Sequence, residues 1–288
     1  DGICPFYKSM RIALSGARGQ LGSFFDAYFK KTDDQIDAFS RNDWDISSKE
    51  QSEEILATGN YNVLINCAAY TDVERAESNQ EACMNINASA VKHLSDQCKK
   101  NGILLVHFST DYIFDGESGA PYVESDKPNP LNVYGASKLE GERIIQTSGC
   151  RHLIGRVSWL FGGQEVGFTS KLEHWRTQSN LLRVSSDEVS TPTFAGHVPV
   201  LISSAIQRNL EGIFHINNTG SCSRYEWAAF YADLNNWRKT IIEPAVLSSF
   251  KMKAHRPHFS AMCNKQFQNL CATSIPHWTE AVMESCKN

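Results

Sequence analysis

Met10-Arg-Ile-Ala-Leu-Ser-Gly-Ala-Arg-Gly-Gln-Leu-Gly22 joins an apolar run to a glycine-rich turn near the start of the sequence. Apolar side chains then recur at positions 21, 24, 25, 28 and 29, which lie on one face of a helix. In the order strand, glycine turn, helix, such a motif can bind a pyrophosphate, because the glycines allow close backbone approach and the helix N-terminus attracts an anion. The spacing is GxxGxxG, which alone is weak evidence. We expect a dinucleotide site here, with a simple chain turn as the alternative.

Strand-like and helix-like segments alternate from Met10 to about Thr147. Short apolar runs at 35–39, 63–69 and 103–108 are typical of buried strands, and about 81–100 carries the apolar face of a helix. This alternation predicts βαβ units and a parallel sheet. We therefore expect an α/β fold, a Rossmann-like doubly wound parallel sheet with a smaller C-terminal substrate-binding cap.

The expected domain division follows from the same pattern. Residues 10–160 are predicted to form the NAD(P)-binding Rossmann domain, and residues 161–288 mainly the cap, with some segments returning to the Rossmann sheet. Residues 1–9 lack the basic and apolar regions of a signal peptide, so we interpret them as an expression remnant or an upstream extension before Met10.

Composition excludes several function classes. The 288 residues are 41% hydrophobic and 21% charged, as in an ordinary globular protein. A net charge of −4 provides no basic field for nucleic acid, and no apolar run approaches the roughly 20 residues of a membrane span. The nine cysteines form no CxxC pair and no Cys/His metal pattern. We expect a cytoplasmic protein, and we assign no metal ligands.

Four polar residues point to proton chemistry. Ser109 and Thr110 end a buried strand, at the edge where α/β sheets present functional groups. Tyr134 and Lys138 lie four residues apart, hence on one face of a helix. An ammonium near the phenol favours the tyrosinate and is expected to lower the pKa of Tyr134. Tyr134 could then exchange a proton with an oxygen held by Thr110.

The residues after the second predicted strand bear on the cofactor. An acid there would bind the ribose 2′-hydroxyl of NAD, but the sequence has Ser40-Arg41. A guanidinium favours a 2′-phosphate, which indicates NADPH, with NADH as an alternative. Arg41 could also be an ordinary surface arginine with no role in cofactor binding. Ala68 and Ala69 are small residues that let a flat ligand approach. Asn87 falls on the sheet-facing side of its helix and needs partners there.

Together these motifs resemble the extended short-chain dehydrogenase/reductases, and within them the dTDP-4-dehydrorhamnose reductase family. The likeness extends from Met10 to about Lys265. It is carried by the stretches Gly16–Gly22, Trp44–Ser47, Ile65–Glu77, Ser109–Gly116, Pro130–Glu142, Ser158-Trp159, Ser190–Thr193 and Arg256–Ser260.

The resemblance implies an activity and a set of roles. The activity is NADPH-dependent reduction of the 4-keto group of a dTDP-4-keto-6-deoxy sugar to dTDP-L-rhamnose, with Thr110, Tyr134 and Lys138 as catalytic residues. The implied cofactor-binding residues are Gly16, Arg18, Gly19, Gln20, Leu21, Gly22, Ser40, Arg41, Asp45, Ile46, Ala68, Ala69, Tyr70, Ser109, Tyr134 and Lys138. The implied substrate-binding residues are Thr71, Thr110, Tyr112, Tyr134, Trp159 and Arg256. Some relatives use Mg²⁺, for which we assign no site, and the chain is expected to be a monomer or a homodimer.

Cap positions depart from the family pattern. Gly167 stands where asparagine is usual, and the stretch around Glu188 and Ser190 is altered. A carboxylate in place of an amide at position 188 is expected to weaken binding of a diphosphate.

Two other readings stay open. One is a nucleotide-sugar 4-epimerase of the same fold; a 4,6-dehydratase fits less well, because Tyr112 follows Asp111 where a second acid is typical. The other is a non-catalytic NADP-binding regulatory subunit resembling that of methionine adenosyltransferase, although Ser158-Trp159 and Thr110 argue against it.

Overall fold

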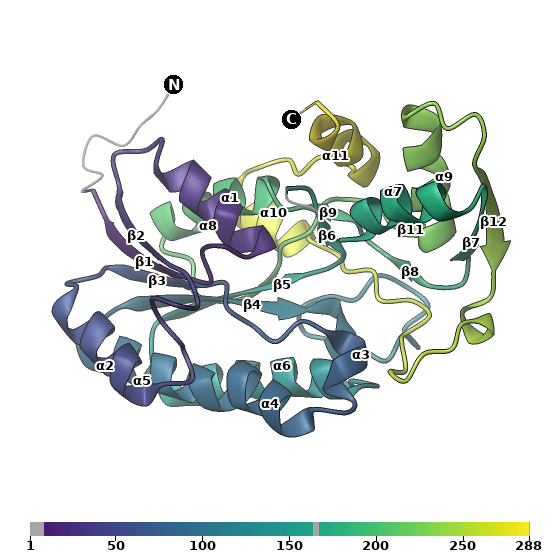
Figure 1. Cartoon of the computed structure of the whole chain (residues 1–288). Coiled ribbons are helices and arrows are strands. Elements are labelled where there is room, and N and C mark those ends of the chain that lie inside the picture. The colour runs from purple at the N-terminus through teal and green to yellow at the C-terminus, as the bar shows by residue number, and fades with distance from the viewer. Residues whose placement is uncertain (1–8, 164–166, 288) are drawn as a thin grey trace.

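The centre of the molecule is a six-stranded parallel sheet with the order β10-β5-β4-β3-β1-β2 (Figure 1). The computed structural model describes residues 9–163 and 167–287, so all but Ser9 of the predicted N-terminal appendage lies outside the described residues. The strands are β1 (Arg11–Ser15), β2 (Gln35–Phe39), β3 (Val63–Asn66), β4 (Leu104–Thr110), β5 (His152–Val157) and β10 (Gly212–His215). This topology confirms the predicted doubly wound α/β fold.

The strand order reverses between β1 and β3. The chain passes from β1 outward to β2, then returns to pair β3 with the other side of β1. Such a switch point opens a crevice beyond the carboxyl ends of the strands. The glycine turn after β1, residues 67–71 after β3 and Thr110 at the end of β4 all lie at this edge.

Helices cover both faces of the sheet (Figure 1). One layer contains α1 (Gln20–Phe29), α8 (His197–Gln207) and α10 (Lys265–Cys271), and the other α2 (Lys49–Thr58), α5 (Ala90–Asn101) and α6 (Val133–Ser148). All seven residues of β4 are buried, as expected of a strand covered on both faces. Phe25, Phe29 and Phe267 pack under the first layer, and each such ring contributes about 1.5–3 kcal/mol by leaving water.

The segment predicted as one helix over about 81–100 is interrupted. After α3 (Val73–Ala76), α4 (Gln80–Met84) leads into a π-helical turn, η1 (Asn85–Ser89), and then into α5. Asn87 lies in this turn, and its side chain bonds both the N–H and the C=O of Tyr70. The wider turn is typical of functional sites. Here it carries the amide that fixes the loop after β3.

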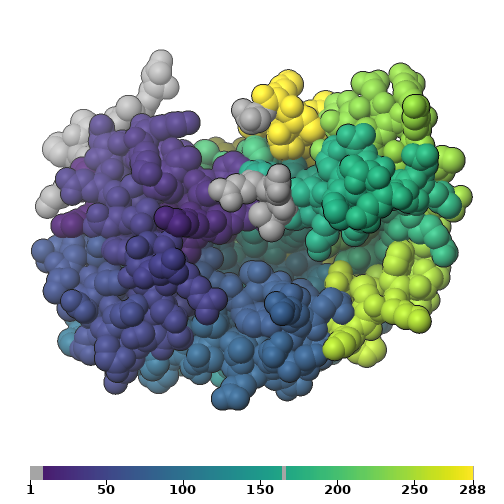
Figure 2. Space-filling view, viewed as in Figure 1, coloured from purple at the N-terminus to yellow at the C-terminus, as the bar shows by residue number. Residues whose placement is uncertain are grey.

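Most residues beyond position 160 build the right-hand part of Figure 1. Its elements are β6 (Leu160–Phe161), α7 (Phe168–Gln178), β7 (Leu181–Ser185), β8 (Val189–Ser190), β9 (Thr193–Phe194), β11 (Cys222–Ser223), α9 (Arg224–Leu234), β12 (Ile241–Ala245), η3 (Leu247–Ser249) and α11 (Trp278–Ser285). They form two-stranded sheets β11-β8, β12-β7 and β6-β9. Trp159, Phe161 and Trp227 pack together between them. Figure 2 shows a hollow between this part and the purple and blue N-terminal part.

Candidate active site

The glycine turn packs directly against the end of β3. Gly16 has a φ of +70°, and a Cβ there would lie 2.7 Å from the N atom of Ala68. A Cβ on Gly22 would lie 2.1 Å from the carbonyl oxygen of Gly16. Gly19, which has no side chain to cap α1, stands at the helix N-cap with an extended backbone. The turn is therefore compact, and α1 begins without a side-chain cap, as the helix start at an anion site does.

Cationic side chains flank the end of β2. Arg18 and Arg41 are both exposed, whereas Ser40, which precedes Arg41, is buried. The carboxylate of Asp43 accepts from the hydroxyl of Ser40 at 2.6 Å and from its N–H at 2.9 Å. These bonds, with a smaller contribution from Arg18, hold the pKa of Asp43 below its usual value. Our sequence reading overlooked Asp43, because it lies three residues beyond the position where an acid was sought.

The neighbouring residues Asp45 and Ile46 have local structural roles. Asp45 accepts from the N–H and the hydroxyl of Ser47, and Ile46 is buried in the core with Trp44 and Leu56. Their predicted position beside an adenine stays a prediction.

The loop after β3 is held by two asparagines. Asn66 accepts from the hydroxyl of Ser15 at 2.7 Å and from the N–H of Ala68 at 3.2 Å. Asn87 clamps the backbone of Tyr70. Ala69 and Tyr70 are partly buried and Thr71 is exposed, so residues 68–71 form a fixed rim of the crevice.

Thr110 and Tyr134 meet, as the sequence predicted. The Thr110 hydroxyl donates to Oδ1 of Asp111 at 3.1 Å, and it lies close enough to the Tyr134 phenol to oppose the rise in the phenol pKa. Within the described part of the chain, the neighbouring Ser109 hydroxyl is buried without a hydrogen-bonding partner. A buried polar atom of this kind normally has a partner, so this strand end is suited to receive a polar ligand atom.

Asp111 organises this strand end. Its Oδ2 accepts from the hydroxyls of Ser190 at 2.9 Å and Ser260 at 2.6 Å. Burial raises the pKa of Asp111 to about 6 against these hydrogen bonds. Ser190, one of the departures from the family pattern, thus has a defined place in the network.

The predicted effect of Lys138 on Tyr134 is wrong in this structure. Burial raises the pKa of Tyr134 above its usual value, and the nearby Thr110 hydroxyl opposes that rise only in part. Lys138 is itself buried, which lowers its pKa to about 8. Its Nζ lies 3.4 Å from Nε2 of His107. The sequence places the two side chains on one helical face, but it does not reveal this second partner.

Trp159, which the sequence predicts to line the substrate site, is covered by an arginine that the sequence analysis did not single out. The Arg224 guanidinium lies 3.5 Å from the centroid of the Trp159 ring, and its Nε is 3.7 Å from Oε1 of Glu188. The hydroxyl of Tyr112 donates to the same oxygen at 3.1 Å. Glu188 is therefore charge-balanced inside the protein. Arg224 opens α9 far along the chain, and no local motif marks it.

Arg256 and Gly167 complete the predicted positions. Nη2 of Arg256 donates to Glu74 of α3 at 3.0 Å, which joins the C-terminal segment to the Rossmann side. Gly167 is the N-cap of α7 with a φ of +102°, a conformation that favours glycine. Gln20 donates to the carbonyl oxygen of Gly162 at 3.1 Å, so α1 also contacts the chain after β6.

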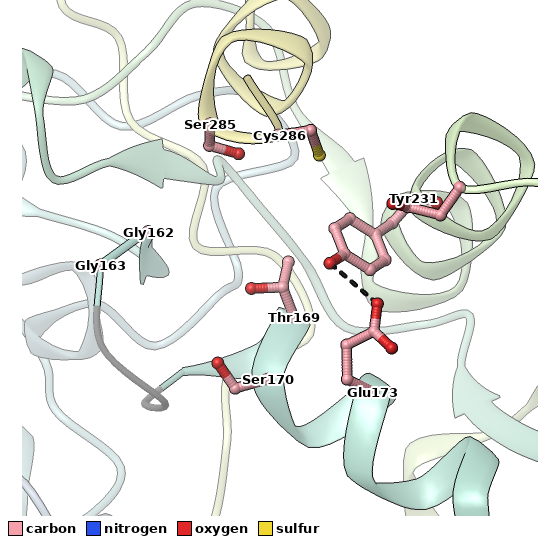
Figure 3. A pocket seen from close by; sticks show the side chains of 9 residues that line it. Gly162, Gly163, Thr169, Ser170, Glu173, Tyr231, Ser285 and Cys286 are labelled. Atoms are coloured by element: carbon pink, nitrogen blue, oxygen red, sulfur yellow. Dashed lines mark hydrogen bonds between the residues drawn. The ribbon is translucent and has the colours of Figure 1, made fainter. Parts of the chain in front are cut away.

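A separate pocket of about 260 Å³ lies among α7, α9 and the end of α11 (Figure 3). The Tyr231 hydroxyl donates to Glu173 along one wall of this pocket at 3.2 Å (Figure 3). None of the described residues that line it is a predicted site residue. In residues 9–163 and 167–287, no group of three or more His, Cys, Asp or Glu could hold a metal ion, and no helix is long and apolar enough to cross a membrane.

Comparison with known proteins gives a consistent result. The profile of the family described as "RmlD substrate binding domain" matches residues 10–288. The dTDP-4-dehydrorhamnose reductases of Mycobacterium tuberculosis and Escherichia coli K12 are each 30% identical to the chain; the alignments cover 96% and 95% of it and 92% and 96% of those proteins. The crystal structure of dTDP-4-dehydrorhamnose reductase from Bacillus anthracis in complex with NADP superposes with a TM-score of 0.93 at 29% identity, covering 97% of this chain and 99% of that one.

Proposed function

Because the chain belongs to the RmlD substrate binding domain family, we propose that it reduces the 4-keto group of a dTDP-4-dehydro-6-deoxy-L-hexose to give dTDP-L-rhamnose. The relatives at 30% identity are named for this reaction and are matched over 92% and 96% of their length. The observation that carries the proposal is the placement of the Thr110 hydroxyl beside the Tyr134 phenol, at the edge of the sheet where the strands end.

The chain's own residues supply binding and proton transfer. The Thr110 hydroxyl, which donates to Asp111 in this structure, would turn its proton to the keto oxygen and hold that oxygen beside the phenol. Tyr134 would then pass its proton to that oxygen as the C4 carbon becomes tetrahedral. Trp159, with Arg224 stacked on it, would form a wall of the sugar site. The hydride comes from the nicotinamide cofactor when it is bound.

The cofactor we propose is NADPH. The compact glycine turn and the uncapped start of α1 suit a pyrophosphate, and Arg18 and Arg41 at the end of β2 suit a 2′-phosphate. The reductase of known structure from Bacillus anthracis was solved with NADP. The residues that we propose to bind the cofactor are those predicted from the sequence. Ile46, which is buried in the core, would support the site from beneath.

A direct assay tests the reaction. Purified protein is incubated with the dTDP-4-keto sugar, and the absorbance of NADPH is followed. We expect turnover by the wild-type protein and a loss of about 10²–10⁴-fold in Tyr134→Phe, because the general acid is removed. Tyr231→Phe, in the separate pocket, is the matched control and should keep its activity.

The other readings have distinct outcomes in the same experiment. Tightly bound NAD⁺ with sugar isomerisation and no use of added NADPH would indicate an epimerase. Absence of turnover together with stable co-purification of a larger partner would indicate a regulatory subunit. Undiminished turnover by Tyr134→Phe would rule out Tyr134 as the proton donor of the proposed mechanism.

We place the reaction in the cytoplasm. The eight described cysteines are free thiols, which suits a reducing compartment. Whether the chain is a monomer or a homodimer stays a prediction, and light scattering of the purified protein measures it.

A further inference from the structure

A chain of buried polar groups runs behind Lys138, and the proposed reaction does not use it. It consists of Ser15 at the end of β1, Asn66 at the end of β3 and His107 in β4, all of them buried. The links are Ser15 to Asn66 at 2.7 Å, Asn66 to His107 at 3.1 Å and His107 to Lys138 at 3.4 Å. Because the chain ends on Lys138, the proton positions within it bear on that lysine.

The backbone fixes the orientation of the Asn66 amide. The N–H of Ala68 can only donate, and it meets Oδ1 of Asn66 at 3.2 Å. The Ser15 hydroxyl donates to the same oxygen. The NH₂ group of Asn66 must therefore face Nδ1 of His107.

That orientation decides the tautomer of His107. Nδ1 accepts from the amide, so a neutral ring carries its proton on Nε2. Burial, with the nearby Lys138, holds the pKa of His107 well below its usual value, so the ring stays neutral. The Nε2–H then points at Nζ of Lys138. It meets a lone pair if Lys138 is an amine, but a competing donor if Lys138 is an ammonium.

We propose that His107 is a positioning residue, locked by Asn66 as the Nε2–H tautomer, that donates to Nζ of Lys138 and favours the neutral amine. The inference rests on the proposed function, in which Lys138 keeps the catalytic role that the family resemblance implies. The other titratable groups that act on Lys138 are Cys67 and Cys83 on the neighbouring elements and Glu142 on its own helix. Glu142 is paired with Arg156 at 2.9 and 2.8 Å, so His107 is the neighbour whose proton faces the amine.

The tautomer can be read directly, without activity. Long-range ¹H–¹⁵N NMR of protein labelled with ¹⁵N-histidine distinguishes Nε2–H, Nδ1–H and the imidazolium. The missing signal in His107→Gln, or in His107→Asn if the first variant does not fold, gives the assignment. We expect the Nε2–H tautomer from about pH 6 to about pH 9. A ring protonated on Nδ1, or an imidazolium in that range, would overturn the proposal.

Two variants test the coupling. In Asn66→Asp the new carboxylate accepts from Nδ1, so the tautomer should invert, while Asn79→Asp, at the exposed start of α4, should leave it unchanged. In His107→Gln the amide can turn its oxygen to the ammonium, so the alkaline limb of the pH profile of kcat should move up by about one pH unit. His152→Gln is the matched control for that limb. An unmoved limb in active His107→Gln, or an unchanged tautomer in folded Asn66→Asp, would refute the coupling.

The outcomes separate the two proposals. An inactive wild-type protein with the Nε2–H tautomer would refute the reductase and keep the assignment of the proton. An active wild-type protein with the Nδ1–H tautomer would support the reductase and refute the assignment of the proton. If Asn66→Asp does not fold, the wild-type spectrum still decides.

Discussion

Asp111 is a buried carboxylate that accepts from three hydroxyl groups and touches no ligand in the proposed reaction. Its pKa of about 6, against the ordinary 3.8, means that the folded chain keeps a proton that the unfolded chain releases. Between these two pH values the unfolded state binds fewer protons, so stability falls as the pH rises. The difference corresponds to about 3 kcal/mol of stability lost by about pH 7.

We expect Asp111→Asn to remove this pH dependence, because the amide does not titrate. Urea unfolding at several pH values between about 4 and 7 measures the free energy of unfolding for wild type and variant. The wild-type curve should fall by about 3 kcal/mol relative to the variant curve. Asp233→Asn, an exposed position in α9, should run parallel to wild type. If the stability curves of wild type and Asp111→Asn ran parallel between these pH values, the Asp111 carboxyl of the folded protein would already be charged in the acid range.

Arg18 and Arg41 allow a test of cofactor choice. Both are exposed near the end of β2, where we propose the 2′-phosphate. Arg18→Ala with Arg41→Ala should raise the Kd for NADPH about tenfold or more and leave that for NADH nearly unchanged. Fluorescence titration measures both, with Arg143→Ala on α6 as the control. The NADPH effect should shrink at high salt; equal losses for the two cofactors would argue against a phosphate contact.

Sequence reasoning at this scale finds pairs that are local or share a sheet edge. The meeting of Thr110 and Tyr134 follows from a strand end and a helix start. The partners of Asp111 do not follow, because Ser190 and Ser260 are 79 and 149 residues away in the chain. The error about the pKa of Tyr134 has the same origin. Spacing places Lys138 on the right face, but burial and the contact with His107 are tertiary properties.

At the scale of elements, α6 lies so close to the π-helical turn that a glycine is needed between them. A Cβ on Gly141 would lie 2.4 Å from the carbonyl oxygen of Asn87, which is backbone and cannot move alone. The sequence predicts helices on both sides of this contact. The turn itself depends on Asn87 reaching Tyr70 and Ser137, so periodicity alone predicts one uninterrupted helix.

Gly141→Ala therefore tests the close approach by the sign of its effect. Helix propensity alone would make alanine about 1 kcal/mol more stabilising than glycine. We expect instead a loss of about 1–3 kcal/mol in the free energy of unfolding, because the helices must separate. Chemical denaturation measures it. Ala136→Gly, at an exposed position of the same helix, measures the effect of helix propensity alone on the free energy of unfolding. A Gly141→Ala variant that is more stable than wild type would show that the helices separate at no cost.

At the scale of the whole molecule, the division at residue 160 is a sequence prediction, whereas several contacts join the two sides. Arg156 in β5 bonds Glu142 of α6 through two nitrogens and the carbonyl oxygen of Glu124 at 3.3 Å. Next to it, β10 pairs with β5, and the N–H of His215 donates to the Glu124 carboxylate at 3.0 Å. Segments from both sides of residue 160 therefore meet around one buried ion pair.

Removing one partner of this pair tests whether the two sides unfold together. Glu142→Gln leaves Arg156 buried with its charge uncompensated, which should cost about 3–5 kcal/mol. Glu140→Gln breaks the exposed pair with Arg143 on the same helix and should change stability by less than about 1 kcal/mol. Urea unfolding is followed by far-UV circular dichroism and tryptophan fluorescence. Because β10 is part of the main sheet, we expect one transition, coincident by both probes and shifted as a whole in Glu142→Gln. Two transitions, with only one of them shifted, would mean that the residues beyond 160 fold as an independent unit.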